Sequence, residues 1–164
     1  MTEQNPNTAP LKNDEDEILE GFDLHSFFPY QVRVFYRAVS QSVSNIYGSR
    51  YGLTVPEWRA MAVLGPYGTL SASEIVQRSS MDKVNVSRAI KGLQKANFLK
   101  RDIDGEDKRR AVLRLTKEGR EAYSILVPLV KNLEANLLDG LTDLEKEMLT
   151  ALMDKIRLKA EALS

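Results

Sequence analysis

The sequence predicts a mainly α-helical fold with one small β-hairpin. In several long stretches apolar residues recur every three or four positions, which is the spacing that one buried helix face requires. Three segments have the form of a capping box, which marks a helix start. Two short apolar runs, joined by a highly charged segment with a glycine, are typical of a hairpin. At 164 residues the chain is long enough for one domain with a substantial core.

The first 20 residues are predicted to form a disordered acidic tail. Residues 1–20 contain six acidic residues, one basic residue and two prolines. A segment of this composition buries too little apolar surface to offset the entropy lost when it becomes ordered. We therefore expect it to lie outside the folded domain and to act as a solubilising tail.

A long helix is predicted for residues 24–50. Gly48 and Gly52 mark its end. Its apolar stripe consists of Val32, Phe35, Tyr36, Val39, Val43, Ile46 and Tyr47.

A second helix is predicted to begin in the capping box of residues 54–57 and to run to Leu64. Pro56 suits its first turn, where no backbone donor is needed. Gly65, Pro66 and Gly68 then predict a turn.

Two shorter helices follow, joined by a tight turn. The capping box of residues 71–74 opens a helix that is expected to end near Ser79, and Asp82 can cap the next helix over residues 83–96. Two short helices with this connection form a helix-turn-helix pair, whose second helix enters the major groove of DNA.

Residues 98–103 and 111–115 are predicted to be the strands of the hairpin. Leu113 and Leu115 must pack inward, so the charged loop before them projects as a finger. A rigid basic finger suits a narrow minor groove, whose negative potential attracts arginine. The residues of this finger are Asp107, Lys108, Arg109 and Arg110.

The chain returns to helix after Thr116, over residues 117–162. Pro128 predicts a bend in the first of two helices, and Gly140 separates them. Their apolar stripes are Leu126, Val130, Leu133 and Leu137 in the first, and Leu144, Met148, Leu152 and Ile156 in the second. One small domain has little need of so many long apolar helices. We therefore infer that the first and the last two helices form a two-fold dimer interface.

Charge and composition support binding to nucleic acid and argue against an enzyme. The net charge is zero, but residues 55–120 hold fourteen basic against eight acidic residues, a net of +6. Phosphate binding requires such a concentration of positive charge, although a solvated lysine-rich face gives a similar count. There is no cysteine and only one histidine, and neither a phosphate-binding glycine loop nor a nucleophile motif occurs. No cofactor is expected. Without an apolar run of membrane-spanning length, a cytoplasmic protein is expected.

The run from Asp107 to Thr116 fits the signature D-x-R-x-x-x-L-x-L-T, and Gly119 continues it as T-x-x-G. In this respect residues 24–162 resemble the MarR/SlyA family of winged-helix regulators. The resemblance implies a winged helix-turn-helix DNA-binding lobe over residues 54–116, helical dimerisation regions around it, and a palindromic operator in double-stranded DNA. Arg109 matches the wing-tip arginine of the family, which enters the minor groove, and Asp107 matches the acid that holds the loop.

On the predicted recognition helix, spacing places Val84, Ser87, Arg88 and Lys91 around one face. We expect the candidate base contacts to be Arg88 to guanine, with Asn85 or Ser87 at other base edges. Lys83 and Lys91 are expected to contact phosphate. For each of these residues the alternative is an ordinary solvated position. An alternative role for the acidic tail is autoinhibition as a mimic of DNA.

No acidic residue occurs between His25 and Pro56, whereas Arg33 and Arg37 share one helix face. A bound anion would explain this pair, and so would an acidic residue from another segment or subunit. Residues 28–37 and 51–59 also resemble MarR regulators of hydroxycinnamate catabolism, which hydroxycinnamoyl-coenzyme A thioesters release from DNA. That resemblance implies an aromatic acid or acyl-coenzyme A effector such as p-coumaroyl-coenzyme A, with phosphates near both arginines. The residues expected near its aromatic end are His25, Tyr30, Tyr36 and Trp58.

The sequence therefore predicts a ligand-responsive, homodimeric transcriptional repressor with no membrane partner. Two alternatives remain open. One is an architectural DNA-binding protein without a ligand switch, and the other is a MarR-type regulator that responds to an unrelated small molecule.

Overall fold

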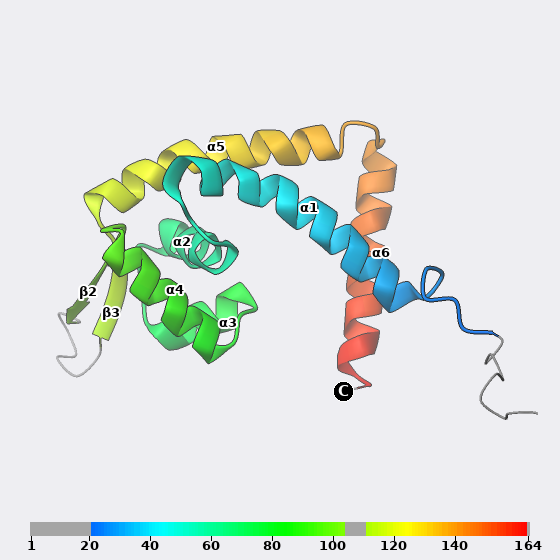
Figure 1. Ribbon diagram of the computed structural model, residues 1–164, viewed down its shortest axis with the longest axis horizontal. Helices are drawn as coiled ribbons and strands as arrows, with labels where there is room; N and C mark the ends of the chain where they lie inside the picture. Colours follow the sequence, from blue (N-terminus) through cyan, green and yellow to red (C-terminus); the bar gives the residue numbers. More distant parts are fainter. Residues whose placement is uncertain (1–20, 104–110, 164) are drawn as a thin grey trace, which may run out of the picture. The chain divides into compact units, whose positions relative to one another are not determined.

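The structure is a computed structural model that describes residues 21–103 and 111–163. It falls into two compact units, one up to Arg37 and one from Ala38 onward. The prediction of a mainly α-helical fold with a small hairpin is confirmed (Figure 1). The helices are α1 (Phe28–Tyr51), α2 (Val55–Tyr67), α3 (Ala72–Ser79), α4 (Lys83–Lys95), α5 (Lys117–Leu137) and α6 (Asp143–Glu161), and the strands are β1 (Thr69–Leu70), β2 (Leu99–Ile103) and β3 (Ala111–Leu115).

The helix starts lie where the capping motifs predicted them. The N-cap residues of α2, α3 and α6 form complete capping boxes, and α4 and α5 are capped by one side chain each. In α3, for example, the Ser71 hydroxyl accepts a hydrogen bond from the backbone N–H of Glu74, and the Glu74 carboxylate accepts one from Ser71 N–H at 2.7 Å. Each such cap stabilises its helix by about 1 kcal/mol.

The first helix begins at Phe28 rather than at residue 24. Asp23 accepts hydrogen bonds from the backbone N–H groups of His25 and Ser26, at 3.0 and 3.2 Å, and so holds these residues in a turn. Side-chain hydrogen bonds of this kind compete with helix formation. Pro29 then lies in the first turn of α1, where its missing N–H group has no cost.

The prediction of a turn at Gly65 and Pro66 was wrong, because α2 continues to Tyr67. Gly68, with φ of 75°, ends the helix, and its N–H group donates to the Leu64 carbonyl at 2.9 Å. Gly65 has a packing role instead, since a Cβ atom there would overlap the ring of Tyr123 in α5. Sequence patterns alone do not distinguish a glycine needed for close packing from one needed for a turn.

The sheet has three antiparallel strands in the order β1-β3-β2. Pairing of β2 with β3 runs from Leu99 opposite Leu115 to Ile103 opposite Ala111. The third strand, β1, was not predicted. It has only two residues, and it is defined by pairing with β3 rather than by any periodic pattern of its own.

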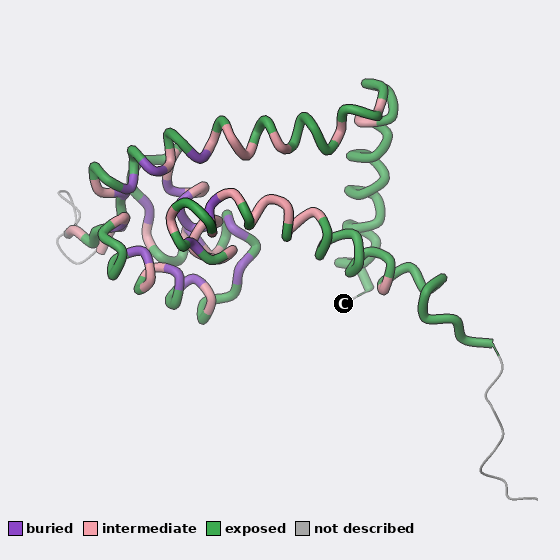
Figure 2. The backbone as a smooth tube through the Cα atoms, turned by 45° about the horizontal axis from the view of Figure 1, so that its top comes forward, coloured by how far each residue is buried: buried purple, intermediate pink, exposed green. Residues whose placement is uncertain are grey.

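The core lies within the second unit. Its largest fully buried side chains come from five helices: Tyr47, Met61, Leu64, Ile75, Val86, Leu93 and Leu126. Figure 2 shows that buried positions are concentrated in α2, α4 and the strands, whereas α6 has none. The DNA-binding lobe predicted from the sequence is therefore the best-packed part of the second unit.

The T-x-x-G motif joins this lobe to α5. The Thr116 hydroxyl accepts a hydrogen bond from Gly119 N–H at 3.0 Å and donates one to the Asn97 carbonyl at 2.7 Å. The Thr116 N–H group donates to the Phe98 carbonyl at 3.1 Å. A Cβ atom on Gly119 would overlap that same carbonyl oxygen, so only glycine fits. Both defining residues of the motif, Thr116 and Gly119, thus have a structural role.

Candidate nucleic-acid interface

The helix α4 presents one face to the core and the opposite face to solvent. Val86, Ala89 and Leu93 are almost fully buried, and Asp82 caps the first turn. This packing fixes the rotation of the helix about its axis. Its exposed side chains include five in the first nine residues, Lys83, Val84, Ser87, Arg88 and Lys91, and Gln94 and Lys95 are exposed near its end. Four of these five were predicted to contact DNA, and the structure places all four on the accessible side.

Asn85 lies beside the helix cap. Its backbone N–H group donates to Asp82 Oδ1 at 2.7 Å, and its amide Nδ2 donates to Asp82 Oδ2 at 2.6 Å. The backbone hydrogen bond from Asn85 is the main cause that lowers the pKa of Asp82, with a smaller contribution from the charge of Arg88. The Asn85 amide therefore already has a partner, and its predicted base contact stays a prediction.

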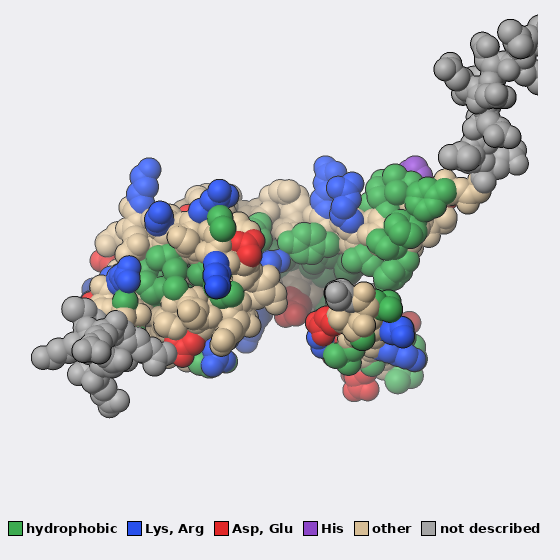
Figure 3. All heavy atoms as spheres, turned by 90° about the horizontal axis from the view of Figure 1, so that it is seen from below, with side chains coloured by type: hydrophobic (Ala, Val, Ile, Leu, Met, Phe, Trp, Pro, Cys, Tyr) green, Lys and Arg blue, Asp and Glu red, His purple; other side chains and the backbone are tan. Residues whose placement is uncertain are grey.

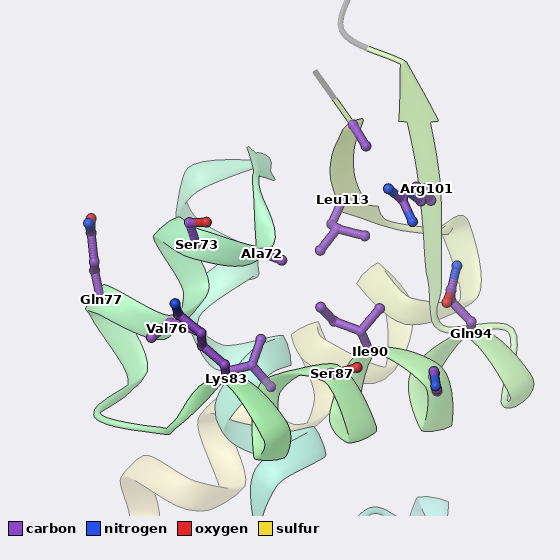
Figure 4. A pocket seen from close by; sticks show the side chains of 13 residues that line it. Ala72, Ser73, Val76, Gln77, Lys83, Ser87, Ile90, Gln94, Arg101 and Leu113 are labelled. Atoms are coloured by element: carbon purple, nitrogen blue, oxygen red, sulfur yellow. The ribbon is translucent and has the colours of Figure 1, made fainter. Parts of the chain in front are cut away.

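A hollow of about 630 Å³ opens between α3, α4 and the hairpin. Figure 4 shows Ile90 of α4 and Leu113 of β3 pointing toward one another across it. Three residues predicted from the sequence, Lys83, Ser87 and Lys91, line its α4 side. The hollow therefore combines an apolar floor with a basic edge.

The same hollow is lined by polar residues that the sequence analysis missed, namely Ser73, Gln77, Gln94 and Arg101 (Figure 4). Arg101 is the most informative of them. It lies two positions after the buried Leu99 on β2 and pairs with Leu113 in the sheet register. Alternate residues of a strand share one face, so this spacing predicts that the exposed Arg101 lies on the same face of the sheet as Leu99.

The wing itself, with Asp107, Lys108, Arg109 and Arg110, lies outside the described residues. The described strands form its stem. On the other face of the hairpin, the Asp102 carboxylate forms ion pairs with Arg114 and, at 3.8 Å, with Lys100. Arg101 has no acidic partner among the described residues.

The predicted effector residues are divided between the two units. His25, Tyr30, Arg33, Tyr36 and Arg37 belong to the first unit. The Tyr30 ring is central to this group: the His25 ring lies at its edge, with centroids 5.6 Å apart, and the Arg33 guanidinium carbon lies 5.7 Å from its centroid.

The structure also identifies an acidic residue at this site, just before the acid-free stretch. The His25 side chain lies 3.5 Å from the Asp23 carboxylate, and the hydrogen bond from His25 N–H is the main cause that lowers the pKa of Asp23. The Arg37 side chain, in contrast, has no ion-pair or hydrogen-bond partner among the residues that the structure describes.

Trp58 belongs to the second unit and packs against the core. Its ring is stacked between those of Tyr47 and Tyr123, at centroid distances of 5.5 and 6.4 Å. This stacking accounts for its presence without any ligand. Its predicted contact with an effector is untested.

A second hollow of the second unit, about 400 Å³ in volume, lies between α1 and α5. It is lined by amides and aliphatic side chains, not by the aromatic rings that the sequence analysis expected of an effector pocket. The lining residues are Asn45, Ile46, Ser49, Arg50, Leu129, Asn132, Leu133 and Asn136. Arg50 forms no ion pair within the described part of the chain.

Residues 21–103 and 111–163 contain no cluster of three or more histidine, cysteine or acidic residues that could hold a metal ion. They also contain no helix with the length and apolar character needed to cross a membrane.

Comparison with known proteins places this geometry in context. The sequence pattern of the MarR family matches residues 51–110. Two regulators of Bacillus subtilis of the helix-turn-helix type are each 30% identical to the chain. The alignment with YwaE covers 66% of this chain and 63% of YwaE, and that with YwoH covers 59% and 70%. The chain thus spans less than two thirds of the length of YwaE.

Solved structures show the same fold. A MarR/EmrR family transcriptional regulator from Acinetobacter sp. ADP1 is 26% identical, with a TM-score of 0.76 over 86% of this chain and 99% of that one. Bordetella bronchiseptica BpsR, whose DNA binding is regulated by 6-hydroxynicotinic acid, has a TM-score of 0.74 at 20% identity, covering 84% and 97%. Streptomyces coelicolor PcaV, solved with its natural ligand, has a TM-score of 0.72 at 23% identity, covering 88% and 99%.

Proposed function

This chain belongs to the MarR family of winged-helix transcriptional regulators, and we propose that it is a homodimeric repressor released from its operator by an aromatic acid or its coenzyme A thioester. The observation that carries the proposal is the outward face of α4, where Lys83, Ser87, Arg88 and Lys91 stand exposed beside a basic hollow. A helix that presents cations and hydrogen-bonding groups in this way suits the major groove.

The DNA contacts divide into two classes. Arg88 is the candidate for base reading, because its guanidinium can donate two parallel hydrogen bonds to guanine. Lys83, Lys91 and Arg101 supply charge for phosphate, which fixes position without reading sequence. The wing residues Asp107 to Arg110 complete this proposal at the minor groove.

Dimerisation is supported by apolar side chains that the described chain leaves uncovered. On α6, Leu144, Met148, Leu152 and Ile156 are between 44% and 68% exposed. Figure 3 shows a further concentration of hydrophobic side chains near the single histidine. These include Phe27, Phe28 and Val32, all about half exposed. Apolar surface of this extent marks an interface, and a second copy is the partner that symmetry favours.

The effector is proposed to bind near Arg33 and Arg37, with its phosphates or carboxylate on these two side chains. The Arg37 side chain has no acidic partner among residues 21–103 and 111–163, which supports this, as does the aromatic group formed by Tyr30 and its neighbours. BpsR, a protein of the same fold, responds to a hydroxylated aromatic acid. A ligand relieves repression only as far as it binds the free protein more tightly than the DNA-bound form.

A gel-shift assay tests the proposal. The full chain is mixed at fixed salt with the DNA upstream of its own gene, in the presence of p-coumaroyl-coenzyme A or of free p-coumaric acid. Release by the thioester alone would support phosphate binding at the two arginines. A specific shift that neither compound affects would contradict the proposed effector, while the proposed repressor would stand. Failure to shift any nearby DNA would contradict the repressor.

A second candidate is a regulator that responds to an unrelated polar molecule, and the hollow between α1 and α5 favours it. Arg50 and the three asparagines there could hold a small polar anion. The matched variants Arg37→Gln and Arg50→Gln distinguish the two sites, since each removes one charge from one of them. Loss of ligand response only in Arg37→Gln supports the first site, and loss only in Arg50→Gln supports the second.

A further inference from the structure

Val84 is an apolar residue on the otherwise polar outward face of α4. It is 58% exposed, although it lies in the first turn of a helix whose other apolar side chains pack against the core. It precedes Arg88 by four positions and Lys91 by seven, so the three side chains form one row along the helix. The row faces away from Val86, Ala89 and Leu93, which are buried.

No structural requirement of the lobe explains this valine. It has no part in the core, and a β-branched residue is a weaker helix former than alanine, lysine or glutamate. A polar residue at the same place would cost the folded chain nothing. The side chain is therefore available for contact with a partner, at the surface that the proposed function assigns to DNA.

We propose that Val84 reads the C5-methyl group of a thymine in the major groove. This inference rests on the proposed DNA-binding function. The methyl group is the one apolar feature that a base pair presents there, and it distinguishes thymine from cytosine at the same position. Val84 is a small, stiff, branched side chain, so it can cover a methyl group with little loss of side-chain entropy.

The spacing of Val84 and Arg88 also predicts where that thymine lies. Four residues of an α-helix advance about 6 Å along its axis. Stacked base pairs are about 3.4 Å apart. If Arg88 binds a guanine, the thymine read by Val84 is thus one or two base pairs away from it. Each half-site of the operator is expected to contain both bases.

The test removes the methyl group from the DNA rather than from the protein. The full-length chain first selects its preferred sites from a random DNA library at fixed salt. Each thymine of the selected site is then replaced in turn by deoxyuridine, which lacks only the C5-methyl group. Affinities are measured for the wild type, for Val84→Ala, and for Lys91→Ala as a control on the same helix face.

In the wild type, deoxyuridine at one thymine per half-site is expected to weaken binding about fourfold, the effect of one buried methyl group. Val84→Ala should bind the thymine site more weakly than the wild type does. Its affinity should not fall further when deoxyuridine replaces that thymine. Lys91→Ala should lower affinity for every site and keep the thymine dependence. Val84→Ile should retain it as well, since it keeps the branched methyl group.

Two results would overturn the inference. One is a wild type that binds all deoxyuridine sites as tightly as the thymine site. The other is a Val84→Ala variant with the same thymine dependence as the wild type. If the wild type selects no sequence at all, the proposed repressor fails together with this inference. If site selection depends on Arg88 but on no thymine, the proposed repressor stands and only the proposed role of Val84 is contradicted.

Discussion

The helices α4 and α6 both display an exposed row of side chains, but the two rows are of opposite character. In α4 the apolar side is buried within its own subunit, and the exposed row is mainly cationic. In α6 no residue is buried, and the exposed row is apolar. A cationic row is well hydrated in water, and binding to a polyanion lowers its free energy further. An apolar row is stabilised only when another apolar surface removes it from water. The comparison predicts that α4 contacts DNA and that α6 contacts protein.

The largest effect is expected from placing a charge in the apolar row of α6. Leu152→Glu should raise the dissociation constant of the dimer by roughly 1000-fold, because a hot-spot loss of about 2 kcal/mol in each subunit sums to about 4 kcal/mol. Sedimentation equilibrium measures this constant. Thr150→Glu adds the same charge on another side of α6 and should leave the dimer intact. A dimer equally stable in both variants would contradict the role of α6.

The next largest effect is expected on stability, from a change at Gly119, where α5 packs against the segment between α4 and β2. Gly119→Ala should lower the free energy of unfolding by about 1–3 kcal/mol, because the added methyl group overlaps the Phe98 carbonyl and backbone must move. Urea denaturation measures the change. Gly140→Ala is the control, since a Cβ atom there meets nothing within 4 Å. Equal stability of the two variants would contradict the close approach at Gly119.

A change on the outward face of α4 should affect DNA and leave the dimer unchanged. Arg88→Ala is expected to cost about 1–3 kcal/mol of operator affinity and to relax selectivity at one base pair. Gel shifts on the selected site and on single-base variants measure both effects. Lys131→Ala removes an exposed cation from α5 and serves as the control. An equal loss of affinity in the two variants would contradict base reading by Arg88 and show that it contributes only positive charge.

The smallest effect is a pH dependence that the two helices share. Hydrogen bonds from backbone N–H groups lower the pKa of Asp82 at the start of α4 and of Glu145 at the start of α6. A lowered pKa means that each cap contributes fully above the ordinary pKa of its carboxyl group and is lost as the pH falls through the lowered value.

Asp82→Asn retains a capping side chain that does not titrate, and Glu145→Gln does the same for α6. Each variant should therefore lose less stability than the wild type between pH 7 and pH 3, as measured by urea unfolding. Identical losses in the wild type and in both variants would contradict a role for these carboxylates in acid sensitivity.

The parts of the fold that sequence patterns predicted are those with local causes. The caps at Ser71, Asp82 and Thr116 act on backbone groups within three residues, so the sequence contains the whole interaction. The strand β1 has no such local cause, because it exists only through its pairing with β3. The extension of α2 through Pro66 was missed because a helix can accommodate proline where the preceding packing already fixes its path.

The same distinction applies to the candidate site. Helical spacing alone places Val84, Ser87, Arg88 and Lys91 on one face of α4, and the structure leaves all four exposed. Gln77, Gln94 and Arg101 were missed, since α3, α4 and β2 bring them to one hollow only after folding. For Trp58, the resemblance implied a ligand contact, which stays a prediction. In the folded chain its ring is stacked between Tyr47 and Tyr123, a contact between elements far apart in the sequence that spacing alone does not reveal.

The contacts of Thr116 and Gly119 couple α5 rigidly to the DNA-binding lobe predicted from the sequence. The first turn of α5 is held by hydrogen bonds and by direct contact with the segment that connects α4 to β2, so α5 cannot move there without moving that segment. With 21 residues, α5 is about 30 Å long. Tilting a helix of this length by about 5° displaces one end by roughly 3 Å relative to the other, nearly the spacing of one base pair. If α4 binds DNA as proposed, a rotation at the far end of α5 would therefore shift α4 along the DNA.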